Sequence, residues 1–139
     1  MSTSPFPASI ELSCGPVTAV DLALYAAASG DHNPLHLDDA VARTAGFDRP
    51  VVHGMLTMAY VGRLFTQRFG CNALLALNTR FIGVAKRGDN ILLHAQLSEC
   101  DGKTAQYRLR GCTESGAEIV SGSARVRLPP RANATKTAL

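Results

Sequence analysis

The chain has 139 residues, of which 46% are hydrophobic and 18% charged, and its formal net charge is +3. This length fits one domain that buries a core without help from disulfides or metals. The basic residues are scattered and Trp is absent, so we interpret the mild positive charge as an ordinary solvated surface rather than a nucleic-acid-binding stripe.

Residues 8–14 predict a short first strand, and a helix follows it. Thr18 stands three residues before Asp21, a spacing typical of a capping box at a helix start. The helix should run to about Ser29 and stop at Gly30, because glycine adopts the backbone conformation that commonly ends a helix.

Two more helices are predicted after a short loop. Asp38 or Asp39 can cap a brief helix that ends near Gly46. Residues 51–70 then form a helix whose first three turns are apolar on nearly every side, so we expect protein to wrap it on most sides. At ~1.5 Å per residue, its part from Met55 onward would be about 22 Å long.

After Gly70 the period of the pattern changes from that of a helix to that of a strand. Alternation is clearest in residues 106–110 and 124–128, and the segments KRGD, CDGK and ESG are turn signals. We expect an antiparallel meander with one buried and one solvated face. Its four strands are residues 73–84, 91–100, 104–113 and 117–128.

This order of elements indicates the α+β class, with a single domain over residues 1–130 in which an antiparallel sheet wraps a long central helix. The polar residues 131–139 lack periodicity and predict a disordered tail. No C-x-x-C pair, secretory signal or membrane span is visible. We therefore expect reduced thiols and a cytoplasmic protein with no membrane segment. The cysteines are Cys14, Cys71, Cys100 and Cys112.

The loop SGDHNPLHLDD, residues 29–39, concentrates acidic and imidazole side chains. Pro34 removes a backbone donor and restricts Asn33, so the loop turns rather than coils. The side chains of Asp31 and His36 can then converge on one point. A carboxylate beside an imidazole can activate a water and return a proton, an effect of about 10²–10⁴-fold per positioned group.

A second chemical element is His53-Gly54 at the start of the central helix. The first turn of a helix has unsatisfied N–H groups and positive dipole character. Because Gly54 has no side chain, a thioester carbonyl could approach its N–H, as in an oxyanion hole. Water activated by Asp31 and His36 would then add to the β carbon of the polarised, conjugated double bond.

The residues alone leave ordinary structural roles open for each of these groups. An Asp after Ser-Gly is commonly a turn residue, a lone His is commonly structural, and glycine near a helix start is common. His32, His36 and Asp38 could suggest a metal site, but Pro34 interrupts the helix that would bring them to one face, so we expect no metal.

The segments GDHNPLHLD, residues 30–38, and RPVVHGMLT, residues 49–57, resemble the MaoC-like (R)-specific enoyl-CoA hydratase family. That family has the hot-dog fold. The resemblance is strong over residues 18–70 and looser over the strands, through Arg80-Phe81 and Gly88-Asp89.

The resemblance implies roles by position. Asp31 and His36 match the pair that activates water, and the backbone N–H of Gly54 matches the group that polarises the thioester. Together they are the predicted catalytic residues. The predicted substrate-binding residues are Asn33, His53, Met55, Gly62, Lys86 and Arg87.

By the same resemblance the reaction is the reversible, stereospecific hydration of a trans-2-enoyl thioester to the (R)-3-hydroxyacyl thioester, in fatty-acid breakdown or in supplying monomers for polyester synthesis. No metal or redox cofactor is implied, and coenzyme A enters as part of the substrate. The implied partners are an acyl-CoA or acyl-carrier-protein thioester and a second copy of the chain, joined edge to edge, but neither nucleic acid nor membrane.

Three alternative functions are considered. A 3-hydroxyacyl-carrier-protein dehydratase shares the pair, and its acidic carrier would favour a basic surface. A hot-dog thioesterase typically has an acid or base on the central helix, yet residues 51–70 contain neither Asp nor Glu. Loss of Asp31 or His36 would have indicated a non-catalytic acyl-binding module, and both are present.

Four positions carry open questions. Val84 stands where the family often has proline. This difference puts in question the path of the backbone near the mouth of the substrate tunnel that the resemblance implies. Gly62 either widens the acyl pocket or allows close packing of the sheet. Lys86 and Arg87 flank a turn, where they either meet phosphates or a carrier protein or simply aid solubility.

Overall fold

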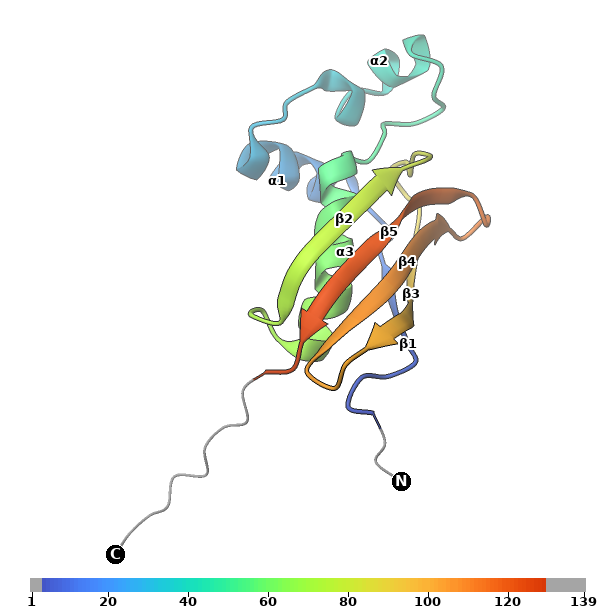
Figure 1. Cartoon of the computed structure of the whole chain (residues 1–139). Helices are drawn as coiled ribbons and strands as arrows, with labels where there is room; N and C mark the ends of the chain where they lie inside the picture. The colour runs from blue at the N-terminus through green and yellow to red at the C-terminus, as the bar shows by residue number, and fades with distance from the viewer. Residues whose placement is uncertain (1–3, 130–139) are drawn as a thin grey trace, which may run out of the picture.

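The computed structural model of the chain describes residues 4–129, and in it a five-stranded antiparallel sheet curls around one long helix (Figure 1). The predicted α+β architecture is confirmed. The predicted tail, residues 131–139, lies outside the described residues. The elements are β1 Ser9–Cys14, α1 Ala19–Ser29, the 3-10 turn η1 Pro34–His36, α2 Asp39–Thr44, α3 Gly54–Phe69, β2 Leu74–Phe81, β3 Ile91–Cys100, β4 Thr104–Thr113 and β5 Glu118–Arg127.

The order of strands in the sheet is β1-β3-β4-β5-β2. The predicted meander is therefore right for β3, β4 and β5 but wrong for β2, which pairs with β5 instead of with its sequence neighbour β3. Short turns join β3 to β4 and β4 to β5, whereas residues 82–90 lie between β2 and β3. That connection is longer than the loops that favour a tight hairpin, so it can cross the end of the sheet.

The alternating strand residues face as predicted. Tyr107 and Leu109 of β4 are buried, as are Ala124 and Val126 of β5. The Tyr107 hydroxyl donates a hydrogen bond of 2.8 Å to the carbonyl of Pro7, so the one polar atom of this core ring is satisfied.

Helix α3 packs one face on the sheet, and that face supplies much of the core. Its opposite side remains exposed in the single chain, with Met55 at 56%. The expectation that protein wraps this helix on most sides is therefore wrong for one copy of the chain. Its buried residues are Thr57, Val61, Leu64, Phe65 and Phe69.

Helix α3 begins later than predicted, at Gly54, because the residues before it are extended. Val51 forms a β-bridge with Lys86, and the N–H of Val52 donates to the carbonyl of Ala85 at 2.8 Å. The segment entering α3 is thus held by the loop between β2 and β3. Among the described residues, no helix combines the length and apolar character needed to cross a membrane.

Helices α1 and α2, with η1 between them, gather beyond the end of the sheet where α3 begins (Figure 1). The predicted capping box of α1 is confirmed: Thr18 accepts from the Asp21 N–H at 3.1 Å, and the Asp21 carboxylate accepts from the Thr18 N–H at 2.8 Å. Gly30 ends α1 with φ 77°, a left-handed conformation that favours glycine. The loop that follows is thereby turned towards the start of α3.

Candidate active site

The loop after α1 folds as a short 3-10 turn that begins at Pro34. Proline is tolerated there because the first residues of a helical turn need no N–H donor. The Asn33 side chain caps the turn by accepting from the Leu35 N–H at 3.0 Å, and the Asp31 carboxylate accepts from the Asn33 N–H at 3.3 Å. Asn33 therefore shapes the loop, while its predicted contact with substrate stays a prediction.

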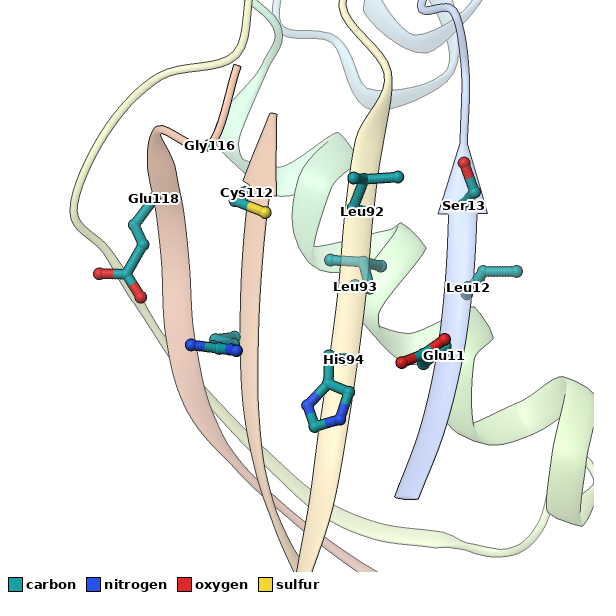
Figure 2. A pocket seen from close by; sticks show the side chains of 10 residues that line it. Glu11, Leu12, Ser13, Leu92, Leu93, His94, Cys112, Gly116 and Glu118 are labelled. Carbon is teal, nitrogen blue, oxygen red and sulfur yellow. The ribbon is translucent and has the colours of Figure 1, made fainter. Parts of the chain in front are cut away.

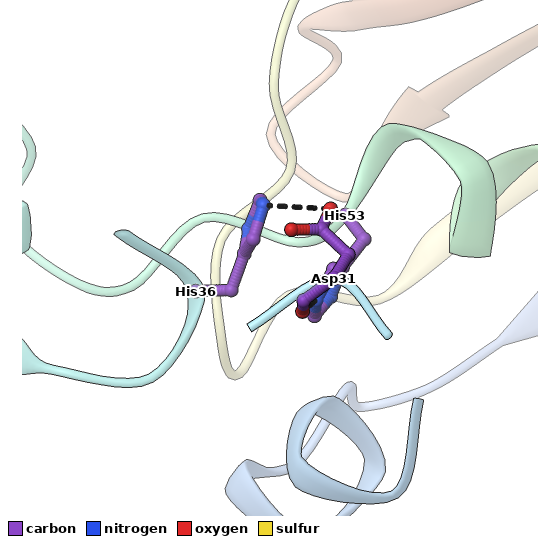
Figure 3. Close-up of side chains that lie close together, drawn as sticks. All are labelled: Asp31, His36 and His53. Atoms are coloured by element: carbon purple, nitrogen blue, oxygen red, sulfur yellow. Dashed lines mark hydrogen bonds and ion pairs between the residues drawn. The ribbon is translucent and has the colours of Figure 1, made fainter. Parts of the chain in front are cut away.

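The turn brings Asp31 and His36 together, as Figure 3 shows. The Asp31 Oδ2 atom lies 3.7 Å from the His36 Nε2 atom. The imidazole side chain is 12% exposed and the carboxylate side chain 50%. An enclosed imidazole thus faces a carboxylate that solvent can reach.

One hydrogen bond settles which nitrogen of neutral His36 carries the proton. The His36 Nδ1 atom lies 2.6 Å from the carbonyl oxygen of Val51, and a carbonyl can only accept. Nδ1 is therefore the protonated nitrogen, and Nε2 keeps a free lone pair on the side facing Asp31. A lone pair in this position can take a proton from water.

His53 occupies a different place from the one predicted for a substrate-binding residue. Its side chain is buried, at 1% exposed, and does not line the cavity described below. Its ring stacks on His36, with centroids 3.8 Å apart and planes 22° from parallel. Burial lowers the pKa of His53, and proximity to His36 lowers it further, although a hydrogen bond to the Asp31 carbonyl opposes this. The ring is therefore enclosed in the single chain, and its direct contact with substrate stays a prediction that this burial does not favour.

A cavity of about 220 Å³ connects His36 with the start of α3. Among the described residues, no side chain caps this helix, so its first N–H groups stay available. The predicted convergence of His36 and Gly54 on one space is therefore present. The lining residues are His36, Val51, Val52, Gly54, Thr57, Phe81, Gly83, Val84, Ala85 and Ile119.

Sequence reasoning missed several of these lining residues, including Thr57, Phe81 and Ile119. Thr57 is a polar residue on the buried face of α3, a signal that was available in the sequence. Phe81 and Ile119 come from β2 and β5, which lie far apart in the chain. Val84, the residue in the place of the expected proline, also lines the cavity.

The other predicted substrate-binding residues do not line this cavity. A methyl group added at Gly62 would meet no atom within 4 Å, so close packing of the sheet does not require glycine there. Met55 lies at the exposed side of α3. Gly62 and Met55 could contact a substrate only if a second copy of the chain formed a binding surface beside them.

Lys86 and Arg87 are engaged in ion pairs. Arg87 donates two hydrogen bonds to the Asp39 carboxylate, at 3.0 and 2.7 Å, and Lys86 donates one to Asp48 at 2.6 Å. These bonds hold the pKa of each carboxyl below its usual value. The two cations tie the β2–β3 loop to α2 and the segment after it, so contact with substrate phosphates remains a prediction that would require breaking these pairs.

Three side chains of the site, Asp31, His36 and His53, offer possible metal-ligand atoms within 4.8 Å of one another. The two imidazole rings, however, are stacked and nearly parallel. Since ring nitrogens bind metals along lone pairs in the ring plane, such rings direct those lone pairs side by side rather than at one point. This geometry supports the expectation of no metal, which stays a prediction.

A larger hollow, of about 510 Å³, lies on the outer face of the sheet, opposite α3 (Figure 2). It is lined by apolar residues such as Leu92 and by charges of both signs, including Glu11 and Arg110. The smaller cavity is the candidate active site, because His36 and the first residue of α3 line it, and neither lines the larger hollow.

A family model described as "MaoC like domain" matches residues 9–115. An (R)-specific enoyl-CoA hydratase of Aeromonas caviae is 36% identical over 115 residues, which cover 80% of this chain and 86% of that protein. The peroxisomal multifunctional enzyme type 2 of Drosophila melanogaster is 33% identical over 109 residues, 76% of this chain but only 18% of that protein.

Two known structures resemble the fold closely. An (R)-hydratase of A. caviae involved in PHA biosynthesis superposes with a TM-score of 0.79 and 34% identity, covering 91% of this chain and all (100%) of that one. An R-hydratase of Pseudomonas aeruginosa in its unliganded form also gives 0.79, with 28% identity and coverage of 87% and 79%.

Proposed function

Because the chain belongs to the MaoC-like domain family, we propose that it is an (R)-specific enoyl-CoA hydratase, a hydro-lyase that adds water to a trans-2-enoyl-CoA to give an (R)-3-hydroxyacyl-CoA. The observation that carries the proposal is the shared cavity: His36 and Gly54 both line it, and the Asp31 carboxylate lies 3.7 Å from His36. The likeness to the A. caviae hydratase over most of both chains supports the same reaction.

In this proposal Asp31 and His36 activate the water. The carboxylate orients the water, and Nε2 of His36 takes one of its protons, because Nδ1 is already committed to the Val51 carbonyl. The remaining hydroxide adds to the β carbon of the substrate. The electron pair of the double bond moves towards the thioester. The α carbon then takes the proton that His36 received from water, so that one water molecule is added in total.

The start of α3 stabilises the charge that develops on the thioester oxygen. The Gly54 N–H belongs to the first turn, where the helix dipole is positive, and within residues 4–129 no side chain makes a capping hydrogen bond to that turn. One donor of this kind is typically worth about 3–4 kcal/mol in the transition state. The reaction as proposed needs no metal and no cofactor besides the coenzyme A of the substrate.

The cavity walls suit an acyl chain. Phe81, Val84 and Ile119 provide apolar surface, and an acyl group placed among them would set its β carbon near His36. An apolar pocket with a few convergent polar groups is typical of small-molecule sites. These walls support an acyl substrate, and the likeness to an enoyl-CoA hydratase supports its thioester.

A 3-hydroxyacyl-carrier-protein dehydratase is the alternative function. A mitochondrial dehydratase of that name from Arabidopsis thaliana is 38% identical over 72 residues, though these cover only 43% of that protein. The pairing of Lys86 with Asp48 and of Arg87 with Asp39 leaves these two cations neutralised. An acidic carrier protein and the phosphates of coenzyme A would both be attracted by free cations, so these ion pairs do not separate the two carriers.

A homodimer joined at β2 completes the proposal. β1 and β2 are the edges of the sheet, and the β2 side carries exposed apolar side chains. A second copy at this edge would cover them and would adjoin the cavity, since Phe81 and Val84 belong to both sets. Light scattering should give twice the chain mass, and a monomer at micromolar concentration would contradict the dimer. The exposed residues of β2 and of the chain directly after it are Leu75, Phe81, Ile82 and Val84.

A cytoplasmic location also belongs to the proposal. All four cysteines are free thiols. Reducing compartments maintain this state, whereas secreted proteins tend to pair their cysteines. Cell fractionation checks it, and recovery outside the cytoplasm would contradict it.

The reaction is tested with crotonyl-CoA and with enoyl-CoAs of increasing chain length. Ultraviolet absorbance follows the loss of the conjugated double bond, and chiral chromatography identifies the product. Asp31→Asn and His36→Ala should fold and lose about 10²–10⁴-fold in turnover, while His32→Ala, in the same exposed loop, should keep it.

Each competing outcome has its own signature. Near-native turnover in Asp31→Asn or His36→Ala contradicts the assigned pair. Release of free coenzyme A without hydration supports a thioesterase. Activity on acyl-carrier-protein substrates alone supports the dehydratase, and a product of (S) configuration contradicts the stereochemical part of the proposal.

A further inference from the structure

His53 contacts both members of the Asp31–His36 pair without reaching the cavity. Its ring face stacks on the His36 ring, with 3.8 Å between centroids. Its Nε2 atom lies 3.2 Å from the backbone carbonyl oxygen of Asp31. Because a carbonyl only accepts, Nε2 donates, and this fixes the protonated nitrogen of the neutral ring. A single buried side chain therefore connects two residues of an otherwise exposed loop.

The ring stack and the hydrogen bond of His53 each restrict a motion of the loop that its own contacts leave free. The His36 ring has one hydrogen bond, from Nδ1 to the Val51 carbonyl, and the ring can still tilt about that bond. The stack with His53 opposes this tilt. The Asp31 side chain is half exposed, so the hydrogen bond from His53 to its main chain limits how far the carboxylate can drift.

His53 is itself rigidly held. Its side chain is 1% exposed, and the Tyr25 ring packs edge-on against it at 4.8 Å. Its position directly before α3 fixes its backbone at the start of the core helix. Its Nδ1 atom has no hydrogen-bond partner among the described residues, so the ring is aligned by packing and by one hydrogen bond.

We propose that His53 is a positioning residue, which holds Asp31 and His36 in reactive alignment through its hydrogen bond and its ring stack and does not touch the substrate. This inference rests on the proposed hydratase function. It replaces the substrate-binding role that the sequence suggested. A misplacement of about 1 Å at a reactive group can cost about 10²-fold in rate, so the contribution of His53 should appear in kcat.

Three substitutions separate the two contacts. His53→Phe keeps a ring for the stack but loses the donor, His53→Gln keeps an amide donor near the place of Nε2 but loses the ring, and His53→Ala loses both. We expect kcat on crotonyl-CoA to fall about 10-fold in each of the first two and about 10²-fold in the third, with KM within about twofold of wild type. His32→Gln, an exposed histidine of the same loop, is the matched control and should keep both values.

A second readout does not depend on catalysis. Nitrogen-15 NMR of the His36 ring should report the Nδ1–H form in the wild type and in His32→Gln, and a mixture of forms in His53→Ala. An unchanged His36 signal in His53→Ala overturns the positioning role, and this test does not depend on activity. A wild type that hydrates no enoyl-CoA refutes the proposed function instead. A raised KM with unchanged kcat would show substrate contact and overturn the positioning role too. Failure of all three variants to fold would assign His53 to the core and also overturn it.

Discussion

Replacing Gly54 with alanine should separate activity from stability. The added methyl carbon would stand 3.6 Å from ring carbons of Phe81, an ordinary van der Waals contact. Alanine is favoured over glycine within helices by up to about 1 kcal/mol, so the melting temperature should stay level or rise. The same methyl group would occupy the space that a thioester carbonyl needs to reach the Gly54 N–H.

The expected loss in kcat/KM for crotonyl-CoA is about 10²-fold, or roughly 2.7 kcal/mol, the lower end of what removal of one oxyanion-hole donor costs. Gln67→Ala is the control, since it changes an exposed side chain of the same helix that does not line the cavity. It should keep native activity. A Gly54→Ala protein with native kcat/KM would show that the carbonyl does not bind at this amide.

Three other outcomes are expected. Phe81→Ala should enlarge the cavity and move the preference towards longer enoyl-CoAs, and an unchanged chain-length profile would contradict the placement of the acyl group. Burial lowers the pKa of His53 from its ordinary 6.5, so the unfolded chain binds more protons at this ring than the folded chain does. The contribution of neutral His53 to the free energy of unfolding is therefore complete above about pH 6.5 and is lost as pH falls. The melting temperature should therefore drop less between about pH 7 and pH 5 in His53→Phe than in wild type, and equal drops would contradict this. Dialysis against EDTA should leave hydration unchanged, whereas a loss that zinc restores would reveal a metal role for Asp31, His36 and His53.

The fold was predictable where local sequence determines it. The capping box of Thr18 and Asp21 needs only its own residues, and alternation in residues 106–110 reports which face of a strand is buried. The place of β2 was not predictable in this way. It depends on a pairing between Phe81 and Val120 that no local pattern encodes.

The site divides in the same manner. The convergence of Asp31 and His36, which lie five positions apart, could be inferred from the loop sequence, because Pro34 enforces a turn. The ion pairs of Arg87 with Asp39 and of Lys86 with Asp48 join positions far apart in the chain, so these two basic residues looked free in the sequence. The burial of His53 was likewise invisible, since it depends on Tyr25 and His36 packing around it.

The four residues before and at the start of α3 link the two halves of the proposed chemistry. The Val51 carbonyl orients the base through Nδ1 of His36, and Gly54 provides the amide for the thioester. The loop between β2 and β3 holds this segment through the bridge of Val51 to Lys86 and the hydrogen bond of Val52 to Ala85. Because the Val51 carbonyl that orients the base and the Gly54 amide lie on one short, doubly anchored segment, the distance between these two backbone groups is set by backbone geometry. A displacement of the β2–β3 loop should therefore impair proton transfer and carbonyl polarisation together.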